Sequence, residues 1–244
     1  MNVFDQLAGF AFCAIRPSVA LSLIPFGNDG ALGVALRVPL VLMFASFPAQ
    51  SGWPADLLQA GAAEVLIGLA LGLMLGIVFH AAAAAGAILD QQGGYSIAAV
   101  YDPNFQQESA LFETLFTQFA TLTFFTGHGL VLVCGFFVDA WSIWPPGGTP
   151  HGGFARLFQT LAETRLPSAF FDGLQLAAPL LGLLLLVDVS LGLASRYARR
   201  LNPFSVARTV KAMVLSFAAM ACVPALLERL ERAVAAALNL GWQP

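Results

Sequence analysis

Side chains that could carry catalysis are sparse in this sequence. The three histidines are His80, His128 and His151, and no two of them have the spacing of a paired metal motif such as H-x-x-x-H. The sequence also contains no G-x-S-x-G motif and no glycine-rich phosphate-binding loop. We therefore predict that the chain is not an enzyme and that it holds neither a metal ion nor a cofactor.

Asp188 is the residue whose position is hardest to explain without a partner. It lies in the apolar stretch 173–194, where a carboxylate needs a cation, a wet cavity or a proton. Gly192 and Arg196 follow it on the same helical face, but eight residues of helix span about 12 Å. A partner on another helix is therefore equally plausible. A proton or ion relay is the functional interpretation of Asp188, and we favour the structural one, a polar lock between helices.

The composition shows what surrounds these few polar groups. Of 244 residues, 58% are hydrophobic and only 10% are charged, whereas soluble domains have roughly 25% charged residues. So few charges cannot cover a water-facing surface. The net charge of −3 also argues against nucleic acid as a partner, because phosphate binding needs an excess of clustered basic residues. The sequence predicts an integral membrane protein.

Uncharged stretches indicate where helices lie. Residues 65–89 and 114–138 are each 25 residues long without a charge, enough as helices to cross the roughly 30 Å hydrocarbon core. Four further apolar stretches are shorter or interrupted, at 6–25, 38–47, 173–194 and 212–227. We predict an all-α membrane protein with about six hydrophobic helical segments.

The basic residues set an expected orientation. Residues 38–155 contain no Lys or Arg, while five of the eleven basic residues fall within 196–211. The positive-inside rule places this basic loop in the cytoplasm. With six spans, residues 86–113 are then also cytoplasmic.

The long stretch 65–89 carries a ladder of small residues. Gly68, Gly72 and Gly76 recur every four residues, a spacing that lets another helix backbone approach closely in lipid. The contact is either with a helix of this chain or with a partner subunit.

A polar segment follows this ladder. Asp90–Ser96 and Asp102-Pro103-Asn104 interrupt the apolar sequence, and the Gly-Gly and Asp-Pro pairs favour non-helical backbone. Such backbone is tolerated between membrane helices where protein buries it or where it lines a wet cavity. We interpret the segment as a candidate constriction or re-entrant element, with an exposed loop as the alternative.

The order of these motifs resembles the FliR/SctT family of type III protein export. Glu64 and the glycine ladder precede G-x3-D-x3-G-x-S, which begins at Gly86. The matching later motifs are Asp102-Pro103, Gly127-His128, Pro179, Asp188-x3-Gly192-x3-Arg196, Leu201-Asn202-x-Phe204 and Lys211. The resemblance covers about residues 60–215. Gln107-Glu108-Ser109 and Trp141-x-x-Trp144-Pro145-Pro146 look more like the injectisome branch (SctT) than the flagellar one (FliR), whereas Pro203 and Arg199-Arg200 depart from the family pattern.

The resemblance implies a non-enzymatic core subunit of the export gate. Members assemble with SctR (FliP-like) and SctS (FliQ-like), associate with SctU (FlhB-like), and close a helical ring through which unfolded secreted proteins cross the bacterial inner membrane. The implied fold is an SctR-like part, residues 1 to about 169, joined to an SctS-like part, about 170–244. A flagellar subunit is the alternative, and a small-solute transporter or an intramembrane enzyme fits less well.

The family also implies two sets of site residues. A pore plug would comprise Asp102, Pro103, Asn104, Phe105, Gln106, Gln107, Glu108, Leu111 and Phe112. Subunit packing would involve Glu64, Gly68, Gly72, Gly76, Asp90, Asp188, Gly192 and Arg196.

Overall fold

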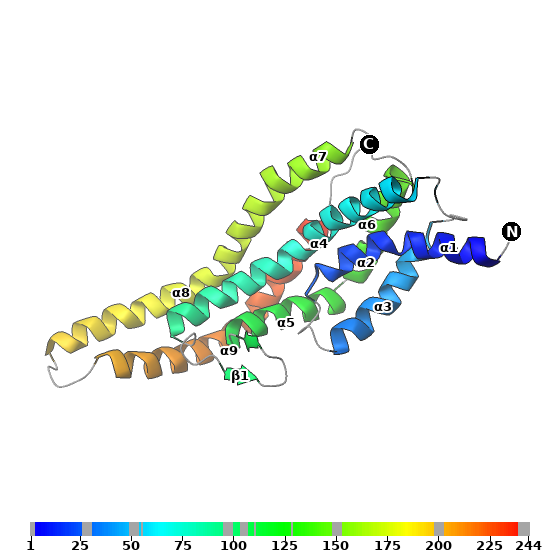
Figure 1. Cartoon of the computed structure of the whole chain (residues 1–244). Helices are drawn as coiled ribbons and strands as arrows, with labels where there is room; N and C mark the ends of the chain where they lie inside the picture. Colours follow the sequence, from blue (N-terminus) through cyan, green and yellow to red (C-terminus); the bar gives the residue numbers. More distant parts are fainter. Residues whose placement is uncertain are drawn as a thin grey trace.

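The part of the chain that the structure describes consists of helices apart from one small hairpin (Figure 1). The computed structural model describes residues 3–25, 31–48, 54, 56–94, 100–102, 107–109, 111–127, 129–147, 153–197 and 203–238. Its helices are α1 (Val3–Cys13), α2 (Ile15–Ser22), α3 (Ala31–Ala45), α4 (Leu57–Gly93), α5 (Leu111–Thr126), α6 (Gly129–Ile143), α7 (Gly153–Thr160), α8 (Leu166–Tyr197) and α9 (Pro203–Leu238). Two short strands, β1 (Val100–Asp102) and β2 (Gln107–Ser109), lie between α4 and α5.

Helix α4 is the centre of the molecule. Its 37 residues extend for about 56 Å at 1.5 Å per residue. The helix is apolar on all sides, a pattern typical of a buried helix, and it packs against α2, α5, α8 and α9. Helix α4 therefore contacts both an N-terminal helix, α2, and the C-terminal helices α8 and α9, as Figure 1 shows.

The prediction of an all-α membrane protein is confirmed, with fewer spans than expected. Among the described residues, three helical stretches are long and apolar enough to cross a membrane, namely 57–93, 158–196 and 209–232. Helix α3 is apolar but short, and the stretch 6–25 is divided between α1 and α2. A fourth span exists only if the bent pair α5 and α6 is counted as one.

The stretch 114–138, which the sequence predicts to be a membrane-crossing helical segment, is not one continuous helix. Helices α5 and α6 meet at an angle of 76° across residues 127–128. A Cβ at Gly129 would lie 2.5 Å from Phe124 O and 2.6 Å from the Phe124 ring, so the chain turns this tightly only with glycine there. An uncharged stretch therefore need not be one helix.

The C-terminal part is a long helical hairpin. A π-helical turn, η2 (Leu161–Arg165), joins α7 to α8 without a break. Residue 170, near which the sequence predicts the junction of the two parts, lies inside α8, and the division itself stays a prediction. Helices α8 and α9 run beside each other and extend beyond the end of α4 (Figure 1).

Candidate functional site

The polar segment after α4 contains a β-hairpin. Strands β1 and β2 pair antiparallel, with Val100 opposite Ser109 and Asp102 opposite Gln107. The predicted plug residues Asp102, Gln107 and Glu108 thus belong to the two strands. Pro103, Asn104, Phe105 and Gln106 lie outside the described residues. We call Val100–Ser109 the β1–β2 hairpin, and its two ends connect to α4 and α5.

Asp90 caps the start of α5, the helix that follows the hairpin in sequence. Its Oδ1 accepts a hydrogen bond from Phe112 N (3.1 Å), and its Oδ2 accepts one from Glu113 N (2.9 Å). These N–H groups open α5 and have no partner within the helix. A carboxylate here also suits the positive end of the helix dipole. Asp90 is only 1% exposed and caps α5 of its own chain, and its assignment to subunit packing stays a prediction.

The backbones of α4 and α5 touch just beside this cap. A Cβ at Gly86 would overlap the carbonyl of Phe112 and lie 2.6 Å from Glu113 Cα. The Phe112 side chain is 2% exposed in the core, whereas Leu111 is 54% exposed. Phe112 therefore anchors α5 in this structure and does not project toward a passage.

Lys211 contacts the end of α4, the helix that precedes the hairpin in sequence. Helix α4 stops where Gly94 adopts a left-handed conformation (φ 76°). Lys211 Nζ donates to Gln92 O at 3.3 Å and lies 2.7 Å from Asp188 Oδ1. The partner of Asp188 is thus on another helix, one of the two possibilities left open by the sequence. Gly192 and Arg196 are exposed, and a Cβ at Gly192 would meet open space.

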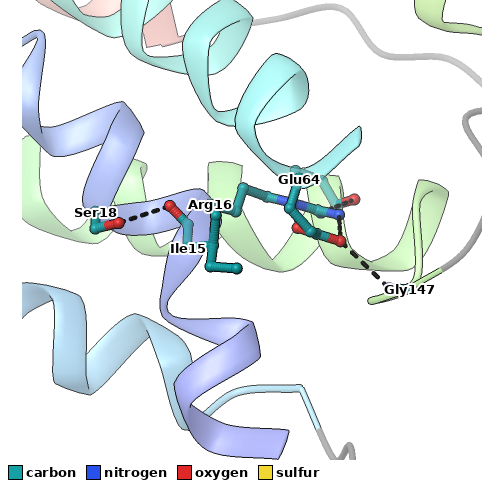
Figure 2. A network of polar contacts seen from close by, with 6 residues as sticks. Ile15, Arg16, Ser18, Glu64 and Gly147 are labelled. Carbon is teal, nitrogen blue, oxygen red and sulfur yellow. Dashed lines mark hydrogen bonds and ion pairs between the residues drawn. The ribbon is translucent and has the colours of Figure 1, made fainter. Parts of the chain in front are cut away.

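A second polar cluster is buried at the opposite end of α4 (Figure 2). Arg16 Nε donates to Glu64 Oε2 (2.7 Å), Arg16 Nη2 donates to Glu64 Oε1 (3.0 Å), and the two residues are 0% and 1% exposed. Arg16 Nη1 also donates to Ala140 O (3.3 Å), and Gly147 N donates to Glu64 Oε1 (3.3 Å). The Arg16 guanidinium lies 3.8 Å from the centroid of the Trp141 ring. This Arg16–Glu64 cluster joins α2, α4, α6 and the turn after α6.

The glycine ladder packs against α2 of the same chain. A Cβ at Gly68 would lie 2.7 Å from Arg16 O, one at Gly72 2.6 Å from Ala20 O, and one at Gly76 2.9 Å from Leu23 O. The contacts seen for Glu64, Gly68, Gly72 and Gly76 are within this chain, and their assignment to contacts with another subunit stays a prediction. The alternative, a helix contact inside this chain, is the one that the structure shows.

Sequence analysis missed Arg16 and the roles of Lys211 and Trp141. Arg16 appears in the sequence as an interruption of an apolar stretch, and Glu64 borders another such stretch. Two isolated charges of opposite sign among apolar segments are expected to pair, because an unpaired buried charge is costly. That signal was available for Arg16 and Glu64. Within the described residues, no three His, Cys, Asp or Glu side chains lie close enough to hold a metal ion.

Comparison with known proteins identifies the family. The model of "Bacterial export proteins, family 1" matches residues 7–237, nearly the whole chain. The chain belongs to this family. The resemblance to the FliR/SctT family is thereby confirmed.

Relatives within bacterial export proteins family 1 come from both branches. Secretion system apparatus protein SsaT of Salmonella typhimurium is 27% identical over 88% of this chain and 86% of its own length. Surface presentation of antigens protein SpaR of Shigella flexneri is 27% identical over 91% of this chain and 87% of its own length. Flagellar biosynthetic protein FliR of Escherichia coli is 34% identical, over 59% of this chain and 54% of its own length.

Proposed function

We propose that this chain is a non-enzymatic core subunit of a type III secretion export gate in the bacterial inner membrane. In this role it closes a helical ring with SctR-like and SctS-like subunits, associates with an SctU-like subunit, and lets unfolded proteins pass. Family membership supports an export apparatus component. The β1–β2 hairpin lies in sequence between the end of α4 that Lys211 contacts and the start of α5 that Asp90 caps, and it is the observation that carries the gating part of the proposal.

Exposed apolar faces on α8 and α9 support assembly with other subunits. The side chains that are more than half exposed there include Leu185, Leu186, Val189 and Leu193 on α8, and Met213, Phe217 and Met220 on α9. A Cβ at Gly182 or at Gly192 would meet nothing within 4 Å, so a partner helix has room to approach. Asp188, Gly192 and Arg196 all belong to α8, and we therefore keep them as proposed subunit contacts on the face that α8 and α9 present.

The hairpin is the proposed pore plug, and its replacement tests this role. Exchanging residues 100–109 for a Gly-Ser linker of equal length removes the strand pairing but keeps Asp90, Gly94 and Phe112. We expect the gate to assemble normally, because the anchors that join α4 to α5 remain. We also expect ion leakage through the inner membrane to rise severalfold, because the segment that blocks the passage is gone.

Potassium efflux from cells and native gels of solubilised membranes give the two readouts. A strain that lacks the gene is the control, because without an assembled gate its efflux stays at background. An assembled gate with unchanged efflux contradicts the plug, and so does a linker variant that fails to assemble.

The injectisome branch is the preferred assignment within the family. SsaT and the Shigella flexneri SpaR align over at least 86% of their own length, against 54% for the Escherichia coli FliR and 80% for the FliR of Pectobacterium carotovorum. Together with Gln107-Glu108-Ser109 and the Trp141–Pro146 motif, this supports the injectisome branch. A clean gene deletion in the source bacterium should abolish effector secretion and leave swimming intact. Loss of swimming with intact secretion would instead assign the chain to the flagellum. Loss of neither, in a strain that secretes, would contradict the export function.

A further inference from the structure

Pro179 leaves a gap in the backbone hydrogen bonds of α8. It lies inside this 32-residue helix, and proline has no backbone N–H. In an α-helix the N–H of residue i donates to the carbonyl of residue i−4. The carbonyl that loses its helical donor is therefore that of Gln175. It lies within the apolar stretch 158–196, which is long enough to cross a membrane.

The side chain of Arg229 on α9 reaches this carbonyl. Arg229 Nη1 donates to Gln175 O at 2.9 Å. Leu226 and Leu230, which lie on either side of Arg229 in the sequence, are buried, and so is Leu176 next to Gln175. Both helices are therefore packed where the bond forms, so the donor and the acceptor are held at this distance by the fold.

The membrane makes this bond more important than it would be in water. Arg229 lies in the apolar stretch 209–232, and the bond is at the surface of the chain, where lipid or another subunit surrounds it within a membrane. A carbonyl freed by proline finds no water in the hydrocarbon core, and a neighbouring helix has to supply its donor. An arginine in a membrane helix in turn needs a carboxylate or a backbone carbonyl as its partner.

We propose that Arg229 is a positioning residue that supplies α8 with the hydrogen-bond donor that Pro179 lacks. Helix α8 then completes its backbone pairing only when α9 lies beside it. This role concerns the fold of the chain itself and does not depend on the proposed export function. It also explains a charged residue in an apolar helix without an ion or substrate pathway.

The alternative explanation is a charge interaction between Arg229 and Asp172, because both residues line one hollow on the surface of α8 and α9. Pro179→Ala separates the two explanations. Alanine restores a backbone N–H that can donate to Gln175 O, whereas the charges of Arg229 and Asp172 stay as they are. The cost of Arg229→Met is therefore measured in two backgrounds, with Pro179 present and with Pro179→Ala.

Unfolding of the purified full-length chain in one detergent, followed by circular dichroism, gives the equilibrium constants. With Pro179 present, we expect Arg229→Met to raise the unfolding constant about tenfold, the effect of losing one charge-assisted hydrogen bond. In the Pro179→Ala background the same substitution should raise it less than about threefold. Arg232→Met is the matched control on α9, because Arg232 donates to Glu228 O of its own helix, and it should cost the same in both backgrounds.

Two results would overturn the inference. One is an Arg229→Met cost that is equal in the two backgrounds, since the charge interaction or the packing of the side chain would then account for it. The other is an Arg229→Met variant as stable as wild type with Pro179 present. Should Arg229→Met alone not fold, the double variant with Pro179→Ala is expected to fold, and its failure to do so overturns the inference as well.

Discussion

Arg16→Met is expected to lower the free energy of unfolding by about 3–5 kcal/mol, the cost of removing one partner from a buried ion pair. The substitution removes three hydrogen bonds, two to Glu64 and one to Ala140 O. Within the described part of the chain, it also leaves the Glu64 carboxylate, 1% exposed, with the Gly147 N–H as its remaining hydrogen-bond donor. A carboxylate so enclosed is costly without a cation.

Unfolding of the purified chain in detergent, followed by circular dichroism, measures this loss. Arg232→Met is the matched control, because Arg232 is 72% exposed and lies 3.9 Å from an equally exposed Glu228. Exposed pairs of this kind contribute roughly 0–1 kcal/mol. If Arg16→Met and Arg232→Met cost the same, the Arg16–Glu64 cluster does not stabilise the fold.

The double variant Arg16→Met with Glu64→Leu tests the origin of the loss. Replacing both members of a buried pair by apolar residues is often neutral, so we expect the double variant to be more stable than Arg16→Met alone. Recovery should be incomplete, because Ala140 O and Gly147 N lose their partners as well. A double variant that is less stable than either single one would show that packing volume, and not the buried charge, dominates.

The membrane class and the central helix could be predicted because they depend on local composition. A stretch of 25 residues without a charge has few alternatives to a buried or membrane helix, and 65–89 lies within α4. The stretch 114–138 has the same property and is nevertheless divided at residues 127–128. There the outcome depends on how the Phe124 ring and carbonyl meet Gly129, which composition does not encode.

The partners of the polar residues could not be predicted for a different reason. The sequence marks Asp188 as a residue that needs a partner, and Asp90 and Glu64 as residues of the family motifs, but the partner of each lies elsewhere in the chain. Glu64 pairs across 48 residues and Asp90 caps a helix that starts 21 residues later. Several residues of the sequence could pair with each of these carboxylates. Which of them does so is decided by how the helices pack.

The glycine ladder also shows that a sequence pattern can predict a close contact without identifying the helix that makes it. Spacing of four residues specifies that a backbone passes close to one face of α4. It does not specify which backbone, and α2 of this chain occupies the face. The consequence for assembly is direct, because a face covered by α2 is not available to another subunit.

Gly72→Ala is therefore expected to destabilise the chain itself, by about 1–3 kcal/mol, the usual cost of overpacking a tight contact. The new Cβ would lie 2.6 Å from Ala20 O and 2.7 Å from Ala20 Cα. Both atoms are backbone, so no side-chain rotation relieves the overlap and α2 has to shift away from α4. Such a shift also strains the bonds between Arg16 and Glu64, because these residues lie on the same two helices.

Gly61→Ala is the matched control on the same helix, since a Cβ at Gly61 meets nothing within 4 Å. There alanine should stabilise the helix slightly, by about 0.5–1 kcal/mol, because glycine loses more conformational freedom on folding. Thermal unfolding of the two variants and the wild type in the same detergent gives the comparison. If the ladder were instead a surface for another subunit, Gly72→Ala would leave the isolated chain as stable as Gly61→Ala and would impair only assembly of the gate. The close contact with α2 predicts the opposite order, in which the isolated chain already loses stability before any partner is added.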